Sequence, residues 1–162
     1  QRIADDIMSE GLQGATSPGR LQLVGIAPTV VVDAAHNPHG AAALAQALDD
    51  SFDFDEWGLV LGILADKDAA GIVERLAPAA AHVFATASDS DRASDADAIA
   101  DLVEQAGQRA TVHPSLADAA DAAREWAASN DRRAVVIAGS VVLAGEAIAL
   151  AEDEDWKSGW HA

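Results

Sequence analysis

The most informative polar residues of the sequence follow an apolar run at residues 29–32. Asp33, His36 and Asn37 come shortly before Pro38, and proline is favoured in the first turn of a helix. Because the free N–H groups at a helix N-terminus attract anions, this turn is a natural anion site. Asp33 could accept a hydrogen bond from a ribose hydroxyl, while His36 and Asn37 could contact a phosphate or a substrate carboxylate.

Two other interpretations of this turn stay open. Asp33 and Asn37 could simply cap the helix, since both residue types are preferred at the N-cap. Alternatively, Asp33, His36 and His39 could bind zinc, which would need a fourth ligand and a geometry that a turn rarely provides.

Two later turns also carry groups that suit an anion. Lys67 stands between Asp66 and Asp68, where it keeps its charge and could neutralise an acidic substrate or a phosphate. Asp68 as an ordinary helix cap, with Lys67 merely solvated, fits the same residues equally well. Gly139 and Ser140 precede a helical segment, so the Ser140 hydroxyl could hold a carboxylate or cap the helix. Ser140 is not predicted to be a nucleophile, because the G-x-S-x-G pattern is absent.

A phosphate-binding loop is missing from the sequence. Residues 14–20 imitate the spacing of such a loop, but Arg20 and Leu21 replace the required Lys and Ser/Thr, and a predicted strand follows in place of a helix. A G-x-G-x-x-G pattern is also absent after the first predicted strands, which disfavours a self-contained dinucleotide site. Arg20 could still clamp a terminal phosphate with two hydrogen bonds, or it could be a solvated surface residue. We therefore expect half of an active site.

The polar turns lie between alternating strands and helices. Apolar runs rich in β-branched residues predict strands at 21–26, 29–32, 58–64, 82–86, 111–113 and 134–138. Helical spacing predicts helices at 38–50 and 69–76, from an N-cap at Ser94 to Gly107, from Ser115 to about Ala128, and from Ser140 to about Leu150. This alternation predicts an α/β fold with a doubly wound, mostly parallel sheet covered by helices on both faces. Ligands of such sheets bind at the carboxyl ends of the strands, where the polar turns lie.

The composition narrows the range of partners and locations. The 162 residues include 27 acidic and 10 basic side chains, a net charge of −17, which makes nucleic acid and anionic membrane surfaces unsuitable partners. The absence of cysteine fits a reducing compartment, and no apolar run approaches the roughly 20 residues needed to span a bilayer. These features predict a cytoplasmic protein. Because the first residue is Gln1 and not Met, we expect a piece of a longer protein.

Taken in chain order, these turns resemble the C-terminal domain of the Mur ligase superfamily, and most closely that of the folylpolyglutamate synthase/dihydrofolate synthases. The matching pieces are residues 18–20, residues 33–38, Gly62 with residues 66–68, the loop around Arg92, and residues 139–140. The resemblance implies a Rossmann-like domain of an ATP-dependent acid–amino-acid ligase. Such an enzyme uses ATP and Mg²⁺ to phosphorylate a folate or dihydropteroate carboxylate, and the amino group of L-glutamate then attacks the acyl phosphate.

The resemblance also implies a role for each candidate residue. Arg20 would contact the terminal phosphate of ATP, Asp33 the ribose, and His36 with Asn37 the phosphate or the incoming glutamate. Lys67 and Ser140 would bind the glutamate carboxylates. His36 and Lys67 are the residues expected to contribute most directly to catalysis. The metal ligands are expected mainly on another domain, and none is assigned to this chain.

The implied domain organisation has three parts. Residues 1–16 would be a linker from a missing N-terminal ATPase domain, residues 17–151 the Mur ligase C-terminal-like domain, and residues 152–162 an acidic tail that we expect to be frayed. The ATPase domain of the same protein would be the principal partner, and the isolated domain would be inactive. Two other functions stay open, namely a non-catalytic binding module for an acidic metabolite and a related ligase that adds an amino acid to a cell-wall precursor.

Overall fold

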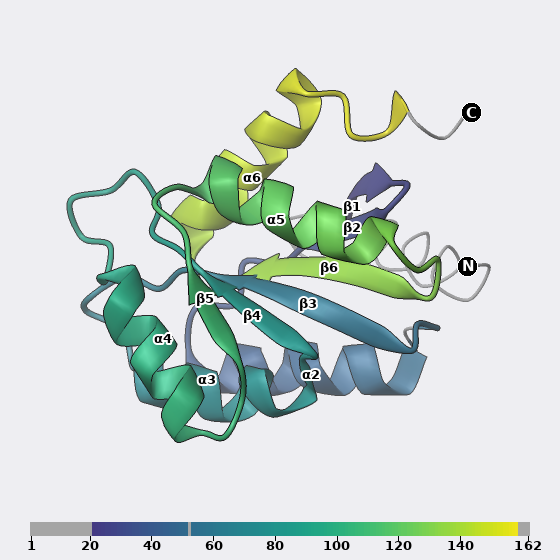
Figure 1. The fold of residues 1–162 in the computed structure, drawn as a ribbon. Helices are drawn as coiled ribbons and strands as arrows, with labels where there is room; N and C mark the ends of the chain where they lie inside the picture. Colours follow the sequence, from purple (N-terminus) through teal and green to yellow (C-terminus); the bar gives the residue numbers. More distant parts are fainter. Residues whose placement is uncertain (1–20, 52, 159–162) are drawn as a thin grey trace.

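A six-stranded sheet forms the centre of the computed structural model, which describes residues 21–51 and 53–158 (Figure 1). The spatial order of the strands is β1-β2-β6-β3-β4-β5. Their bounds are β1 (Gln22–Ile26), β2 (Thr29–Val32), β3 (Glu56–Leu61), β4 (His82–Ala85), β5 (Ala110–Val112) and β6 (Arg133–Ala138). Only the β1 and β2 pair is antiparallel within this sheet. The predicted α/β architecture with a mostly parallel sheet is confirmed.

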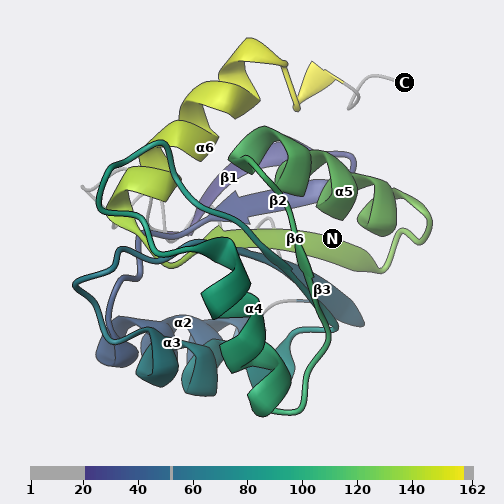
Figure 2. The same cartoon turned by 60° about the vertical axis from the view of Figure 1, so that its left-hand side comes forward.

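Helices cover both faces of the sheet (Figures 1 and 2). On one face lie α2 (Pro38–Ser51), α3 (Ala69–Leu76) and α4 (Ala96–Gln105), with the short 3₁₀ helix η1 (Ala77–Ala79) after α3. On the other face lie α5 (Leu116–Ala128) and α6 (Val141–Asp153). None of the helices in the described ranges is both long and apolar enough to cross a membrane.

The central strands are buried on both faces, as a parallel sheet between two helical layers requires. In β6, Val136 packs into the core under α2, α3 and α4, while Val135 and Ile137 pack into the core under α5 and α6. Alternate side chains of a strand point to opposite faces, so one continuous apolar run supplies both cores. This explains why the strand segments read as unbroken apolar runs.

The predicted start of α4 is wrong by one residue. Asp95, not Ser94, is the N-cap, and its side chain accepts a hydrogen bond from the backbone N of Asp97 at 3.2 Å. Ser94 instead belongs to the segment that is paired with the chain after β3, where its backbone N donates to the carbonyl O of Ile63 at 2.8 Å. The strand expected at 58–64 likewise ends at Leu61, beyond which the chain forms only an isolated bridge.

The expectation of a frayed tail is wrong for residues 152–158. Helix α6 continues to Asp153, and Trp156 beyond it is 2% exposed. The Trp156 backbone N donates to the carbonyl O of Ala151 at 3.0 Å, and the guanidinium of Arg124 lies 4.7 Å from the centre of the indole ring. A single aromatic anchor after a helix has no periodicity, which is why the apolar pattern did not predict it.

We expect Trp156→Ala to lower the free energy of unfolding by about 3 kcal/mol, because truncation of a buried tryptophan removes packing and leaves a cavity. Urea unfolding of the chain, followed by circular dichroism, measures this loss. The control is Lys157→Ala, an exposed neighbour expected to change stability by less than about 0.5 kcal/mol. Equal stability of the two variants would show that the tail does not anchor α6.

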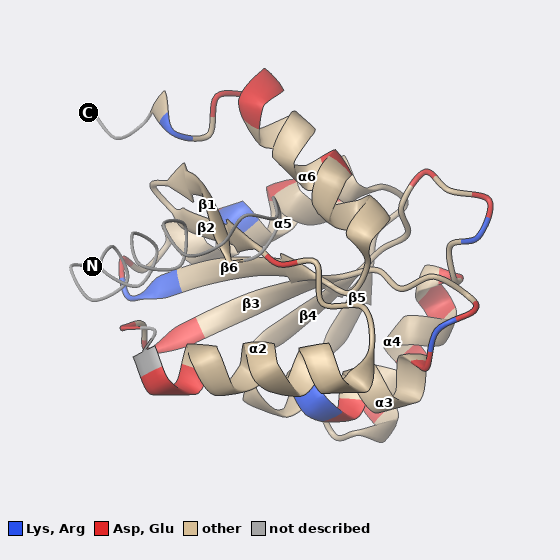
Figure 3. Ribbon diagram, turned by 180° about the vertical axis from the view of Figure 1, so that it is seen from behind, with Lys and Arg blue, Asp and Glu red and all other residues tan. Residues whose placement is uncertain are grey.

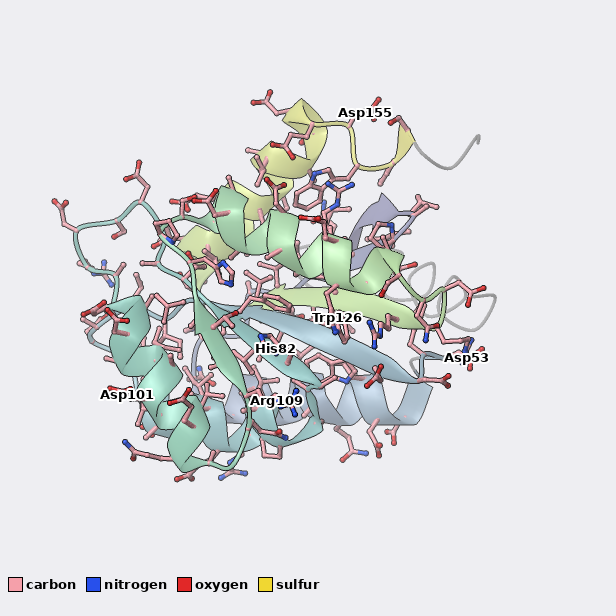
Figure 4. The ribbon with its side chains drawn as sticks, in the orientation of Figure 1. Asp53, His82, Asp101, Arg109, Trp126 and Asp155 are labelled. Atoms are coloured by element: carbon pink, nitrogen blue, oxygen red, sulfur yellow. The ribbon has the colours of Figure 1, made fainter. Side chains whose placement is uncertain are left out.

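His82 and His113 both contact the hydroxyl of Thr111 at the edge of the sheet formed by β4 and β5. The hydroxyl oxygen of Thr111 lies 3.1 Å from Nε2 of His82 and 2.8 Å from Nε2 of His113. Burial lowers the pKa of His82, whose position in the sheet is labelled in Figure 4, and the positive charges of Arg109 and His113 lower it further. The folded chain therefore binds a proton at His82 less readily than the unfolded chain does.

Because the pKa of His82 is lower in the folded state than its ordinary value of about 6.5, its contribution to stability is complete above pH 6.5. That contribution is lost as the pH falls from 6.5 through the lower, folded-state pKa. We expect the free energy of unfolding of the wild-type chain to decrease as the pH falls from 7.5 to 5.5. In His82→Gln the same decrease with pH is expected to be less steep. Chemical denaturation at several pH values measures both slopes, with His39→Gln, an exposed histidine, as control. An unchanged slope in His82→Gln contradicts the assignment.

Candidate functional site

Three turns at the carboxyl edge of the sheet are joined by their main chains. The backbone N of Gly139, after β6, donates to the carbonyl O of Ala35, after β2, at 3.1 Å. The backbone N of Gly62, after β3, donates to the carbonyl O of Ala138 at 3.4 Å. Gly139 has φ +115°, and a Cβ there would collide with the carbonyl O of Gly62. Only glycine permits this approach, so the Gly139-Ser140 turn depends on it.

Asp33 fixes the turn after β2 through its carboxylate. One oxygen accepts from the backbone N of Ala35 at 2.9 Å, and the other accepts from the backbone N of Leu21 at 3.0 Å. Leu21 itself has φ +44°, a left-handed conformation that is unusual for leucine. Asp33 does not cap α2, which begins only at Pro38, so that interpretation of Asp33 is wrong. The carboxylate instead connects the beginning of β1 to the end of β2.

Asn37 is the residue that caps α2. Its Oδ1 accepts from the backbone N of Gly40 at 2.7 Å, and its carbonyl O accepts from the backbone N of Ala41 at 2.9 Å. Capping uses the amide oxygen and leaves the exposed Nδ2 group as a donor for a ligand. The capping and ligand-binding interpretations of Asn37 are therefore compatible.

His36 is half-buried beside this cap, and its ring is oriented by one hydrogen bond. Nδ1 lies 3.0 Å from the carbonyl O of Ala34. A carbonyl oxygen only accepts, so Nδ1 carries the proton, and Nε2 of the neutral ring has a free lone pair. The zinc interpretation of Asp33, His36 and His39 finds no support in the described part of the chain, which contains no group of three or more metal-ligating side chains.

Lys67 lies in the turn after β3, and its two acidic neighbours interact with other residues. Asp68 caps α3 by accepting from the backbone N of Gly71 at 3.0 Å. Asp66 pairs with Arg92 at 3.4 Å, and both side chains are largely exposed. Partial desolvation opposes the ionised form of Asp66, but hydrogen bonds from Arg92 and the backbone still hold its pKa below the ordinary value. Lys67 is half-buried and has no carboxylate partner within the described ranges.

Ser140 caps α6 at the same edge. Its hydroxyl oxygen accepts from the backbone N of Val142 at 3.1 Å and of Leu143 at 3.2 Å, and the residue is 1% exposed. Since both lone pairs face backbone donors, the hydroxyl hydrogen is the part of Ser140 that is left for a carboxylate. The prediction of a helix cap is confirmed, and binding of a ligand by Ser140 stays a prediction.

Cations at the opposite end of the sheet differ from Lys67 in being paired. Arg132 contacts Asp53 at 3.0 Å and Asp55 at 3.6 Å, and Arg133 contacts Glu56 at 2.9 Å. In Figure 3, basic and acidic segments lie side by side where β6 and β3 begin. Lys67 has only the longer-range attraction of Asp66, so this ammonium at the carboxyl edge can attract an anion.

The structure thus places most of the predicted site residues at one edge. Five of the six, namely Asp33, His36, Asn37, Lys67 and Ser140, lie in turns that follow β2, β3 and β6 at their carboxyl ends. Arg20 lies outside the described residues. Sequence reasoning missed the contacts that Arg92 and Glu146 make at this edge, because their partners are 26 and 57 residues away along the chain.

Comparison with known proteins identifies the family of this arrangement. Residues 19–141 match the family model described as "Mur ligase, glutamate ligase domain". A dihydrofolate synthase/folylpolyglutamate synthase from Mycobacterium tuberculosis is 42% identical over 93% of this chain and 34% of its own length. A probable bifunctional folylpolyglutamate synthase/dihydropteroate synthase from Halobacterium salinarum is 37% identical over 90% of this chain and 17% of its own length.

Solved structures agree with the sequence relatives. The folylpolyglutamate synthase of Mycobacterium tuberculosis, complexed with ADP, matches 87% of this chain and 34% of its own, with TM-score 0.81 and 43% identity. The folylpolyglutamate synthase of Thermotoga maritima matches 94% of this chain and 35% of its own, with TM-score 0.73 and 28% identity. This chain therefore spans about a third of the length of such synthases. Because the family model matches residues 19–141 and these two solved structures share the fold, the chain belongs to the Mur ligase family, in which it corresponds to the glutamate ligase domain.

Proposed function

We propose that this chain is the C-terminal domain of an ATP-dependent ligase that adds L-glutamate to a folate or dihydropteroate through an acyl phosphate. Family membership, and the names of relatives that match nearly the whole chain, support the reaction class. The observation that carries the proposal is Lys67, an ammonium with no carboxylate partner in the described residues, at the edge where the turns of Asp33 and Ser140 meet. L-Glutamate has two carboxylates that such an edge could hold.

The edge can perform the binding part of this chemistry. We propose that Lys67, with its three donors, binds one glutamate carboxylate and that the hydroxyl hydrogen of the buried Ser140 is donated to the other. We propose that the Asp33 carboxylate, which accepts from the backbone N of Leu21 and of Ala35, also accepts a hydrogen bond from a ribose hydroxyl. Fixing these partners turns the attack of glutamate on the acyl phosphate into a nearly unimolecular step, which accelerates it.

We propose that His36 and Asn37 contact the phosphate and the incoming amine. Because Nδ1 of His36 is hydrogen-bonded to the carbonyl O of Ala34, Nε2 is the ring nitrogen that we propose receives a proton from the glutamate amino group. The Nδ2 group of Asn37 would donate to a phosphate oxygen. We propose for Arg20 a contact with the terminal phosphate of ATP, in keeping with its guanidinium chemistry.

ATP and Mg²⁺ are the cofactors of the proposed reaction. Solved relatives bind nucleotides, such as the Mycobacterium tuberculosis synthase with ADP and the Yersinia pestis enzyme with AMPPNP and a manganese ion. We propose that the metal ligands belong to an N-terminal ATPase domain of the same protein, connected through residues 1–16, and that the isolated domain is inactive. We also propose a cytoplasmic location. The proposed domain, expected at residues 17–151, includes Trp156 as well, because that side chain packs in its core.

We expect Lys67→Ala and His36→Ala, in the complete protein, to lower kcat/KM for L-glutamate by about 100-fold or more, since each removes a charged or proton-accepting group at the reacting site. The measurement is ATP-dependent addition of radiolabelled glutamate to dihydropteroate and to tetrahydrofolate. Lys157→Ala is the matched control, because it removes an exposed lysine that lies beyond α6.

Three outcomes separate the candidate functions. Wild-type rates in both variants would remove these residues from the mechanism. If the wild-type protein turned over neither folate but did turn over a cell-wall precursor, it would be the related ligase that adds an amino acid to such a precursor. Micromolar binding of an acidic metabolite by this domain alone, without any turnover by the complete protein, would indicate a binding module.

A further inference from the structure

The loop between β4 and α4, residues 86–95, crosses the carboxyl edge and touches two other elements. Figure 2 shows it passing beside the first turns of α6. Thr86 and Ala96, at its two ends, are buried, but none of residues 87–95 between them is. Without buried side chains, the position of this segment depends on hydrogen bonds and not on packing in the core.

The returning limb of the loop is paired with the segment that leads to Lys67. The backbone N of Ala65 donates to the carbonyl O of Arg92 at 2.6 Å, and the backbone N of Ser94 donates to the carbonyl O of Ile63 at 2.8 Å. Leu64 and Ala93 form an antiparallel bridge between these bonds. A displacement of the loop would therefore displace the turn that carries Lys67.

The outgoing limb of the loop is attached to α6 by one acidic side chain. The backbone N of Asp89 donates to Oε2 of Glu146 at 2.9 Å, across 57 residues of sequence. Glu146 is half-buried on the second turn of the helix that Ser140 caps. This hydrogen bond is the contact that attaches the outgoing limb to α6.

We infer that Glu146 is a positioning residue, which holds the 87–95 loop against α6 and thereby sets the distance between Lys67 and Ser140. The inference rests on the proposed function, in which these two residues bind the two carboxylates of L-glutamate. Lys67 and Ser140 lie on different elements, and the described contacts join them through the loop as well as through the Gly62 and Gly139 turns. A dicarboxylate held by both residues is sensitive to that distance, whereas the residues proposed for ATP lie outside residues 87–95.

The test compares Glu146→Ala with Glu146→Gln in the complete protein. Alanine removes the acceptor, while glutamine keeps an oxygen at the same reach for the Asp89 N–H. We expect Glu146→Ala to raise KM for L-glutamate by between about three- and tenfold, the value of one hydrogen bond, with kcat and KM for ATP changed less than about twofold. Glu146→Gln is expected to stay within about twofold of wild type in all three constants.

Two further variants complete the design. Glu152→Ala makes the same chemical change at an exposed position farther along α6 and is expected to leave every constant unchanged. Arg92→Ala loosens the other side of the loop, where Arg92 contacts Asp66. If both variants act through the loop, the effects of Arg92→Ala and Glu146→Ala on KM will not be additive. Arg92→Ala also provides the measurement if Glu146→Ala does not fold.

The outcomes distinguish this inference from the function on which it rests. An unchanged KM for glutamate in Glu146→Ala, with an active wild-type protein, overturns the role of Glu146 and leaves the ligase assignment intact. Equal losses in the alanine and glutamine variants would also overturn it, because the hydrogen bond would not be the cause. An inactive wild-type protein with both folates would refute the proposed function itself.

Discussion

The hydrogen bond from the backbone of Gly139 to the carbonyl of Ala35 is the contact on which the candidate site depends. It joins the ends of β2 and β6, and the absence of a side chain at Gly139 lets the end of β3 approach as well. Side-chain groups can act together only if the backbones that carry them are held within a few ångströms. Here main-chain bonds and two glycines provide that closeness, and the polar side chains are added to a frame that already exists.

The chain uses its few cations in two different ways. Arg132 and Arg133 are paired with carboxylates, while Arg124 lies over the indole of Trp156, so these three stabilise the fold. Lys67 lacks a carboxylate partner in the described ranges although its sequence neighbours are acidic. The acidic neighbours are used for a helix cap and for the contact with Arg92. Lys157 also has no ion pair in the described ranges, so the place of Lys67 at the carboxyl edge is what distinguishes it as a candidate for an anionic ligand.

Much of the fold was predictable from local pattern. Apolar runs and helical spacing predicted the described strands and major helices, because their side chains are buried in a regular order. The turns at Asp33, Lys67 and Ser140 could be assigned to one edge, since parallel strands end on the same side. The exact cap of α4 could not be predicted, because Ser94 is held by a contact with Ile63, which is distant in sequence.

Contacts between loops were beyond the reach of sequence reasoning for the same reason. The bond between Asp89 and Glu146 joins two residues whose types are common on any exposed surface. The packing of Trp156 depends on the positions of α5 and α6 relative to the strands, which no local period encodes. Both features arise from tertiary structure, and both involve parts of the chain where the local apolar pattern is weak or absent.

The double attachment of Asp33 links entry into the domain with the edge where a nucleotide would bind. The carboxylate that we propose for the ribose also accepts from the backbone N of Leu21, whose left-handed conformation needs support from its surroundings. A displacement of Leu21, just before β1, would thus act directly on Asp33 through the hydrogen bond between them. Under the proposed function, movement of the chain that enters β1 and the contact with the ribose would be coupled at this one side chain.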